Sequence, residues 1–90
     1  MNYVAATRAA LARHLPGLEP ELLDLYTLLT LICGDQVTDA HVHDAWAVWR
    51  NRTQPDHRSI LPFTQLARVV QEKDRPYADA IRATAQEPPA

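Results

Sequence analysis

Apolar side chains recur at helical spacing in the first part of the chain. An Ala-rich segment from residue 3 to residue 15 places Val4, Leu11 and Leu15 near one stripe. Asn2 can accept a hydrogen bond from a backbone N–H of the first turn, and a Pro-Gly pair follows the segment. We therefore predict an amphipathic helix over these residues.

The next segment contains more apolar residues, and they occupy more of the helix surface. A second helix is predicted to begin at the Glu-Pro-Glu sequence that starts at residue 19 and to end at about Cys33, where Gly34 can serve as the C-cap. Its apolar positions are Leu22, Leu23, Leu25, Leu28, Leu29, Leu31 and Ile32. Because these positions surround most of the circumference, the stretch 22–32 is either the centre of the domain or part of an oligomer interface.

A third helix should begin at Thr38, whose side chain is suited to an N-cap. Its inward face is predicted to carry Val42, Ala45, Trp46 and Trp49. The stretch from Arg50 to Ile60 has no periodicity and contains a Pro-Asp pair that favours a turn. We predict an ordered loop over about 50–60.

The last third of the chain predicts two further helices. Phe63, Leu66, Val69 and Val70 indicate a short helix, and a break is expected near residues 74–76 because a proline stands there. The closing helix should bury Tyr77, Ala80 and Ile81. Residues 87–90 contain two prolines and predict a frayed tail. The fold class is therefore all-α, a compact bundle of four to five short helices in a single domain over 1–86.

Length and charge narrow the classes of partner. Ninety residues suit one domain, and 47% hydrophobic with 22% charged residues is typical of a globular protein. A net charge of −2 argues against nucleic acid as a partner. The longest apolar run is too short to cross a membrane, and the first residues lack a secretory signal pattern. We expect a cytoplasmic protein, in the host cytoplasm if a phage encodes it.

Metal, cofactor and catalytic motifs are not predicted. His41, His43 and Asp44 suggest a metal cluster, but residues two apart on a helix point about 200° away from each other. Ser59 stands close to His57 but lacks a nucleophile elbow and a third orienting group. The two glycines lie in separate turns, so no phosphate-binding loop is present. These observations favour a protein that binds something over an enzyme.

Arginine and histidine gather beside aromatic residues in the predicted loop. The candidate ligand-binding residues are Trp49, Arg50, Arg52, His57 and Arg58. Guanidinium groups hold phosphate or carboxylate, and an aromatic ring can stack on a base or contact a cation. An anionic small molecule is therefore the predicted ligand. The structural alternative is that Trp46 and Trp49 belong to the core and the arginines form a solvated surface.

Two stretches resemble a known family. Residues 42–50 read Val-His-Asp-Ala-Trp-Ala-Val-Trp-Arg, and residues 57–66 read His-Arg-Ser-Ile-Leu-Pro-Phe-Thr-Gln-Leu. This arrangement resembles the ryanodine-receptor-type repeat, a small domain found in calcium-release channels and in bacterial and phage proteins. The resemblance covers about 40–85 and implies a structural role for His43, Trp46, Leu61, Phe63 and Leu66.

The resemblance also shapes the functional hypotheses. The chain as a whole looks like short actinobacterial and actinophage proteins, and bacterial members of the ryanodine-receptor-type group are associated with conflict systems. The first hypothesis is a non-enzymatic module that binds an anionic, nucleotide-like ligand in such a setting. The alternative is a module for protein–protein interaction or oligomeric assembly that uses the apolar helix 22–32.

Overall fold

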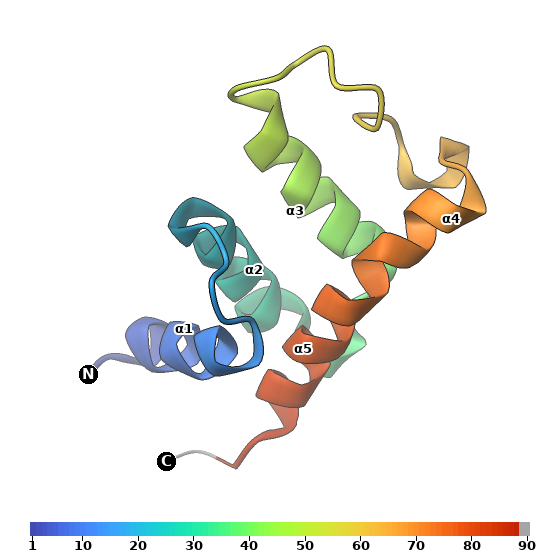
Figure 1. Cartoon of the computed structure of the whole chain (residues 1–90). Helices are drawn as coiled ribbons and strands as arrows, with labels where there is room; N and C mark the ends of the chain where they lie inside the picture. Colours follow the sequence, from blue (N-terminus) through green and yellow to red (C-terminus); the bar gives the residue numbers. More distant parts are fainter. Residues whose placement is uncertain (89–90) are drawn as a thin grey trace.

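Five α-helices and three single 3₁₀ turns make up the part of the chain that the structure, a computed structural model, describes (residues 1–88; Figure 1). The α-helices are α1 (Tyr3–His14), α2 (Pro20–Cys33), α3 (Asp39–Asn51), α4 (Arg68–Gln71) and α5 (Arg75–Gln86). The 3₁₀ turns are η1 (Gly34–Gln36), η2 (Phe63–Gln65) and η3 (Glu72–Asp74). No strand occurs within residues 1–88, so the predicted all-α fold is confirmed.

The helix ends follow from local capping chemistry. The Asn2 side chain accepts the Ala5 N–H at 2.8 Å, which starts α1 as predicted. Gly34, with φ of 56°, ends α2, a backbone conformation that a side chain would strain. At the start of α3, Thr38 Oγ1 accepts the His41 N–H at 3.2 Å, and His41 Nδ1 accepts the Thr38 N–H at 3.0 Å.

The second helix lies at the centre of the bundle. In Figure 1, α2 lies between α1 and α3, and it also packs against α5. The buried hydrophobic residues of this core are Leu11, Leu22, Leu23, Tyr26, Val37, Val42, Ala78, Ala80 and Ile81. The helix α2 also has apolar side chains on its outer side: Leu28, Leu31 and Ile32 are 50%, 39% and 70% exposed. No helix within the described residues has both the length and the apolar character to cross a bilayer.

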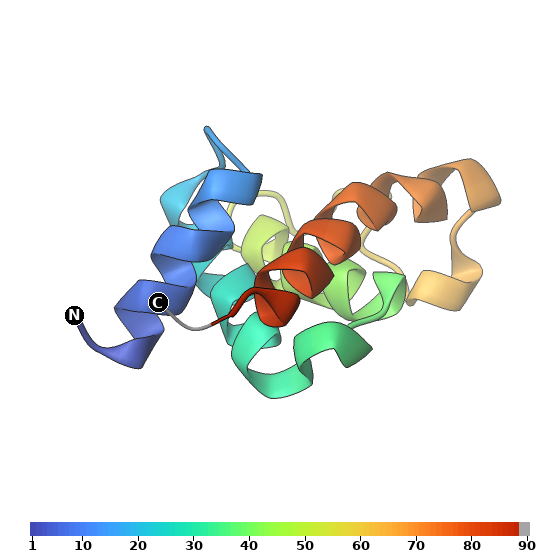
Figure 2. The same ribbon diagram turned by 90° about the horizontal axis from the view of Figure 1, so that it is seen from below.

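The predicted break near residue 75 is wrong, because the chain stays helical from α4 through η3 into α5 (Figures 1 and 2). Arg75 precedes a proline yet adopts φ −57° and ψ −46°. The 3₁₀ turn η3 explains the continuity. Its tighter winding lets the Arg75 N–H bond to the Glu72 carbonyl, the carbonyl with which Pro76 would clash in a regular α-helix.

The predicted loop is ordered but begins at residue 52, because α3 extends through Asn51. Successive turns shape it, with the His57 N–H donating to Gln54 O and the Ile60 N–H donating to His57 O, both at 3.0 Å. The end of the loop is held against α3 by a hydrogen bond, in which buried His43 donates from Nε2 to the Leu61 carbonyl at 2.7 Å. The imidazole must be the donor because a carbonyl oxygen only accepts.

The chain returns to α1 after α5. Glu87, the first residue of the predicted tail, forms an ion pair with His14 and lies 3.8 Å from the Arg13 guanidinium. Its backbone N–H donates to the Thr84 carbonyl at 3.2 Å. Residues 89 and 90 of the predicted tail lie outside the described residues.

Replacing His43 should destabilise the fold. His43→Ala leaves the Leu61 carbonyl without its donor and opens a cavity beside α3, so we expect unfolding to become easier by at least about 1–3 kcal/mol. Asp44→Ala is the matched control, because that neighbouring side chain is exposed and its loss should change stability by less than about 0.5 kcal/mol. Chemical denaturation of both variants measures the difference. Equal stabilities would show that the loop does not depend on this hydrogen bond.

Candidate functional site

A pocket of about 550 Å³ opens between α2, α3, α5 and the loop. Its lining residues are Leu22, Tyr26, His43, Trp46, His57, Ser59, Val70, Lys73, Asp74, Pro76 and Tyr77. We call this site the aromatic pocket. Its volume is in the range of small-molecule sites, and its lining combines apolar walls with a few polar groups, as such sites do.

Aromatic rings come from five of the eleven lining residues. The rings of Tyr26 and Tyr77 lie 5.6 Å apart between centroids, and the His43 ring stacks on Trp46 at 5.7 Å. His57 meets Trp46 edge-on, with centroids 5.1 Å apart and an interplanar angle of 82°. These contacts hold the rings in place, so the pocket offers flat, preformed surfaces to a planar ligand.

Hydrogen bonds within the fold set the tautomers of the two histidines. His57 Nδ1 accepts the Ser59 backbone N–H at 3.0 Å, so the neutral ring carries its proton on Nε2. His43 uses Nε2 for the Leu61 carbonyl, which turns its Nδ1 toward Asp74. The Nε2–H of His57 makes no hydrogen bond to the described residues and remains available as a donor.

Asp74 is the most unusual group in the aromatic pocket. Its side chain is only 13% exposed, its nearest cationic partner is His43 Nδ1 at 3.9 Å, and it accepts no hydrogen bond from the described residues. Burial raises the pKa of Asp74 to about 6, an effect that His43 opposes and the Asp39 charge increases. The carboxyl is thus a strong acceptor that has no donor among the described residues.

Lys73 supplies a positive charge at the same pocket. Its side chain is exposed, and within residues 1–88 it forms no ion pair. A cation that is not neutralised inside the fold can contact an anionic group of a ligand. The pocket therefore offers an acceptor and a cation on consecutive residues.

The predicted arginine cluster does not converge on one point. Arg50 lies over the Trp49 ring at 4.6 Å, with its Nε buried and without a hydrogen bond to the described residues. Arg52 reaches across to α2 and pairs with Glu21 at 2.9 Å. Arg58 is exposed. Of the five candidate ligand-binding residues, His57 alone lines the aromatic pocket, and Trp49 packs against the core.

The five residues predicted to be structural do lie together. His43 contacts Leu61 through the hydrogen bond, stacks on Trp46, and has its ring 6.1 Å from that of Phe63. Leu66 is buried. Trp46 is partly buried and has two roles, because it packs against the core and also lines the aromatic pocket.

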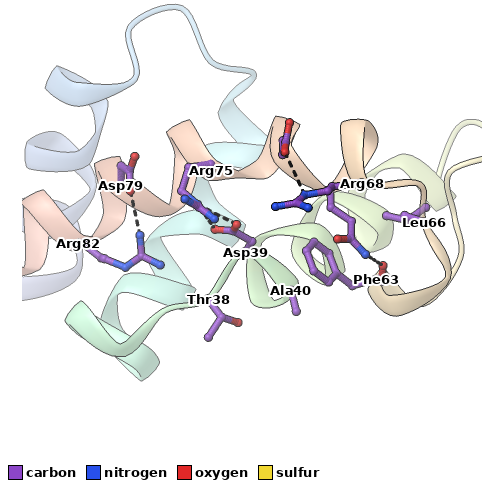
Figure 3. Close-up of a pocket in the computed structure, with 11 residues that line it drawn as sticks. Thr38, Asp39, Ala40, Phe63, Leu66, Arg68, Arg75, Asp79 and Arg82 are labelled. Carbon is purple, nitrogen blue, oxygen red and sulfur yellow. Dashed lines mark hydrogen bonds and ion pairs between the residues drawn. The ribbon is translucent and has the colours of Figure 1, made fainter.

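A second hollow, of about 890 Å³, carries three further arginines (Figure 3). Arg68, Arg75 and Arg82 are seven residues apart and therefore line one side of the helical segment α4 to α5. Each guanidinium is matched by a carboxylate: Glu72 at 3.5 Å, Asp39 at 2.9 Å and Asp79 at 2.9 Å, respectively. Their charges are balanced within the fold, so this hollow has no surplus of positive charge for an anion.

Sequence reasoning missed four of the polar or aromatic residues in the aromatic pocket, and the first, Tyr26, was not among the apolar positions of its predicted helix. Asp74 was assigned to a break and Tyr77 to the core, while Lys73 received no role. The available signal was the spacing of Val70, Asp74 and Tyr77 by four and three residues, which places them on one helix face. That spacing becomes informative once the helix is known to continue through residue 75.

Comparison with known proteins identifies a family. A family model described as a domain of unknown function (DUF7701) matches residues 2–86. The chain belongs to this family. No curated protein and no solved structure matches the chain. The matched span includes α1 and α2 as well as residues 40–85, so the ryanodine-receptor-type resemblance, which covers only the latter part, stays a prediction.

The buried carboxyl predicts a specific pH dependence. The pKa of Asp74 is raised from 3.8 to about 6 on folding, so its stabilising contribution is full below about pH 3.8 and is lost as pH rises through 6. Asp74→Asn stays neutral. The melting temperature of this variant should therefore exceed that of the wild type by little at pH 4 and by more at pH 7.5.

Asp44→Asn is the control for this measurement, because Asp44 is exposed and forms no ion pair within residues 1–88. Its difference from the wild type should stay nearly constant over the same pH range. Thermal unfolding at several pH values measures both differences. A constant difference for Asp74→Asn would show that this carboxyl is not held in an unfavourable environment.

Proposed function

We propose that this domain is a non-enzymatic module that binds an anionic, nucleotide-like small molecule in the aromatic pocket. The observation that carries the proposal is the combination of fixed aromatic walls with Lys73, a cation that has no internal partner. The ligand class is the one that the sequence predicted. The site differs, because His57 alone of the predicted set belongs to it.

The histidine arrangement favours binding over catalysis. Ser59 lines the same pocket, but it is the serine backbone N–H that occupies His57 Nδ1. The Nδ1 lone pair is thus engaged and does not take a proton from a nucleophile. His43 is likewise engaged through Nε2 with Leu61. Both imidazoles therefore hold the fold, and His57 keeps its Nε2–H to donate to a ligand. A role in a phage or bacterial conflict system is part of the proposal and rests on the resemblance alone.

A nucleotide panel tests the proposal. A bound nucleotide present at about 100 times its dissociation constant should stabilise the fold by about 2.7 kcal/mol, which is visible as a rise in melting temperature. Lys73→Ala should weaken that binding about tenfold, because the phosphate loses its cation. Arg52→Ala removes a cation that pairs with Glu21 outside the pocket and should leave the affinity unchanged. If no nucleotide shifts the melting temperature, the proposal is wrong.

A specific surface supports a second candidate function, self-association. Leu28, Leu31 and Ile32 are all exposed on α2. Residues 28 and 32 are four apart, so the three side chains form a neighbouring apolar group on one side of the helix. Adjacent exposed leucine and isoleucine side chains are typical of an interface, and they belong to the helix predicted from sequence to serve assembly.

Light scattering tests self-association. The wild type should have the mass of a dimer or a larger assembly at high concentration, and Ile32→Asp should return it to a monomer because the charge cannot be buried without a partner. Val69→Asp is the matched control, since Val69 is 67% exposed on α4, away from this surface. A wild type that stays monomeric at high concentration excludes self-association through α2.

A further inference from the structure

Asp74 stands where an aspartate ordinarily caps a helix, but its carboxylate does not do so. It precedes Arg75, the first residue of α5, and no backbone N–H of that helix donates to its side chain. The reason is the continuous helix. The Arg75 N–H already donates to the Glu72 carbonyl, so the first turn of α5 follows a preceding turn and is not a free helix end. The Asp74 carboxylate therefore remains available to accept hydrogen bonds in the aromatic pocket.

The surroundings of this carboxylate provide few donors. His43 Nδ1, at 3.9 Å, lies beyond hydrogen-bonding distance, and the side chain is only 13% exposed. An ionised carboxylate has two oxygens and can accept from two parallel N–H groups at once. Leaving such an acceptor nearly buried without donors costs free energy, and the raised pKa of Asp74 has the same cause. A ligand that brings two N–H groups would remove that cost.

The shape of the aromatic pocket restricts what can carry those N–H groups. Trp46 and Tyr77 line the same pocket as Asp74, and rings of this kind accept a flat heterocycle by stacking. Lys73, the neighbouring residue, requires an anionic group on the ligand and disfavours a simple organic cation. The three requirements together are a planar ring, an edge with two adjacent N–H donors and a negative charge.

We infer that the aromatic pocket selects a guanine-type nucleotide, whose ring N1–H and exocyclic amino group both donate to the Asp74 carboxylate. This inference rests on the proposed function and names the base. Hypoxanthine has the ring N–H but lacks the amino group, so it satisfies one oxygen. Adenine presents a ring-nitrogen lone pair at the same edge, which repels the carboxylate. The pocket should therefore rank the three bases by the number of donors on that edge.

Calorimetric titration with guanosine, inosine and adenosine 5′-monophosphates tests this ranking. Titration is preferable to thermal shift because Asp74→Asn itself is expected to change stability. The wild type should bind the guanine nucleotide about tenfold more tightly than the inosine nucleotide, and the adenine nucleotide more weakly still. Asp74→Asn should weaken guanine binding about 10- to 100-fold and should strengthen adenine binding, because the carboxamide no longer repels the adenine ring nitrogen and can donate to it. Asp44→Asn, on the exposed face of α3, should change none of the affinities.

The outcomes separate this inference from the proposed function. If all three nucleotides bind equally well and Asp74→Asn has no effect, the proposed function stands and the selection of guanine is overturned. If none of them binds, both are overturned. Trimethylphenylammonium, which has a ring and a positive charge but no N–H group, is a further probe. Tighter binding of this cation than of the guanine nucleotide would overturn the inference in favour of a site for cations.

Discussion

The hydrogen bond from His43 Nε2 to the Leu61 carbonyl is the contact on which the aromatic pocket depends. The segment between α3 and η2 has no helix of its own, and its interior is shaped by turn hydrogen bonds and by the hydrogen bond from the Ser59 N–H to His57 Nδ1. Because His43 is buried on α3, its hydrogen bond fixes the end of this segment against the core. The loop can then return over α3 with His57 edge-on to Trp46, which closes one wall of the pocket.

The opposite wall depends on the continuous helix from α4 to α5. The 3₁₀ turn η3 accommodates Pro76 without a change of direction, so Asp74 and Tyr77 share one face. Tyr77 in turn lies against Tyr26 from α2. Burial raises the pKa of Tyr26 well above its ordinary value, with contributions from Tyr77 and Asp74, so this phenol stays neutral near the carboxyl. Three separate segments thus surround one acceptor with flat aromatic groups.

Features governed by neighbouring residues could be predicted from the sequence. The caps at Asn2 and Thr38 and the end of α2 at Gly34 depend on side chains within four residues, and each prediction is confirmed. Features that depend on distant partners could not be predicted. The ion pair between Arg52 and Glu21 joins residues that are 31 apart, and it removes Arg52 from the expected cluster.

The break expected at Pro76 failed for a different reason. A residue before proline usually avoids the helical conformation, but the tighter winding of η3 lets Arg75 stay helical. This one error also concealed the pocket. If a new helix is taken to begin near Tyr77, Asp74 is expected to be its N-cap. The Asp74 carboxylate would then accept a hydrogen bond from a backbone N–H of that helix. In the continuous helix that partner is missing, so the carboxylate of Asp74 is an acceptor of the aromatic pocket without a donor from the backbone.

The distribution of ion pairs also indicates the aromatic pocket as the ligand site. Six of the eight arginines pair with a carboxylate: Arg8, Arg13, Arg52, Arg68, Arg75 and Arg82. Exposed pairs of this kind contribute little to stability, but they neutralise charges that could otherwise attract a ligand. Lys73 has no such partner within residues 1–88, and the adjacent Asp74 has only a distant histidine. Arg50 and Arg58 also lack a carboxylate partner among the described residues, but neither lines the aromatic pocket, so Lys73 and Asp74 are the neighbouring cation and acceptor that this pocket offers to a ligand.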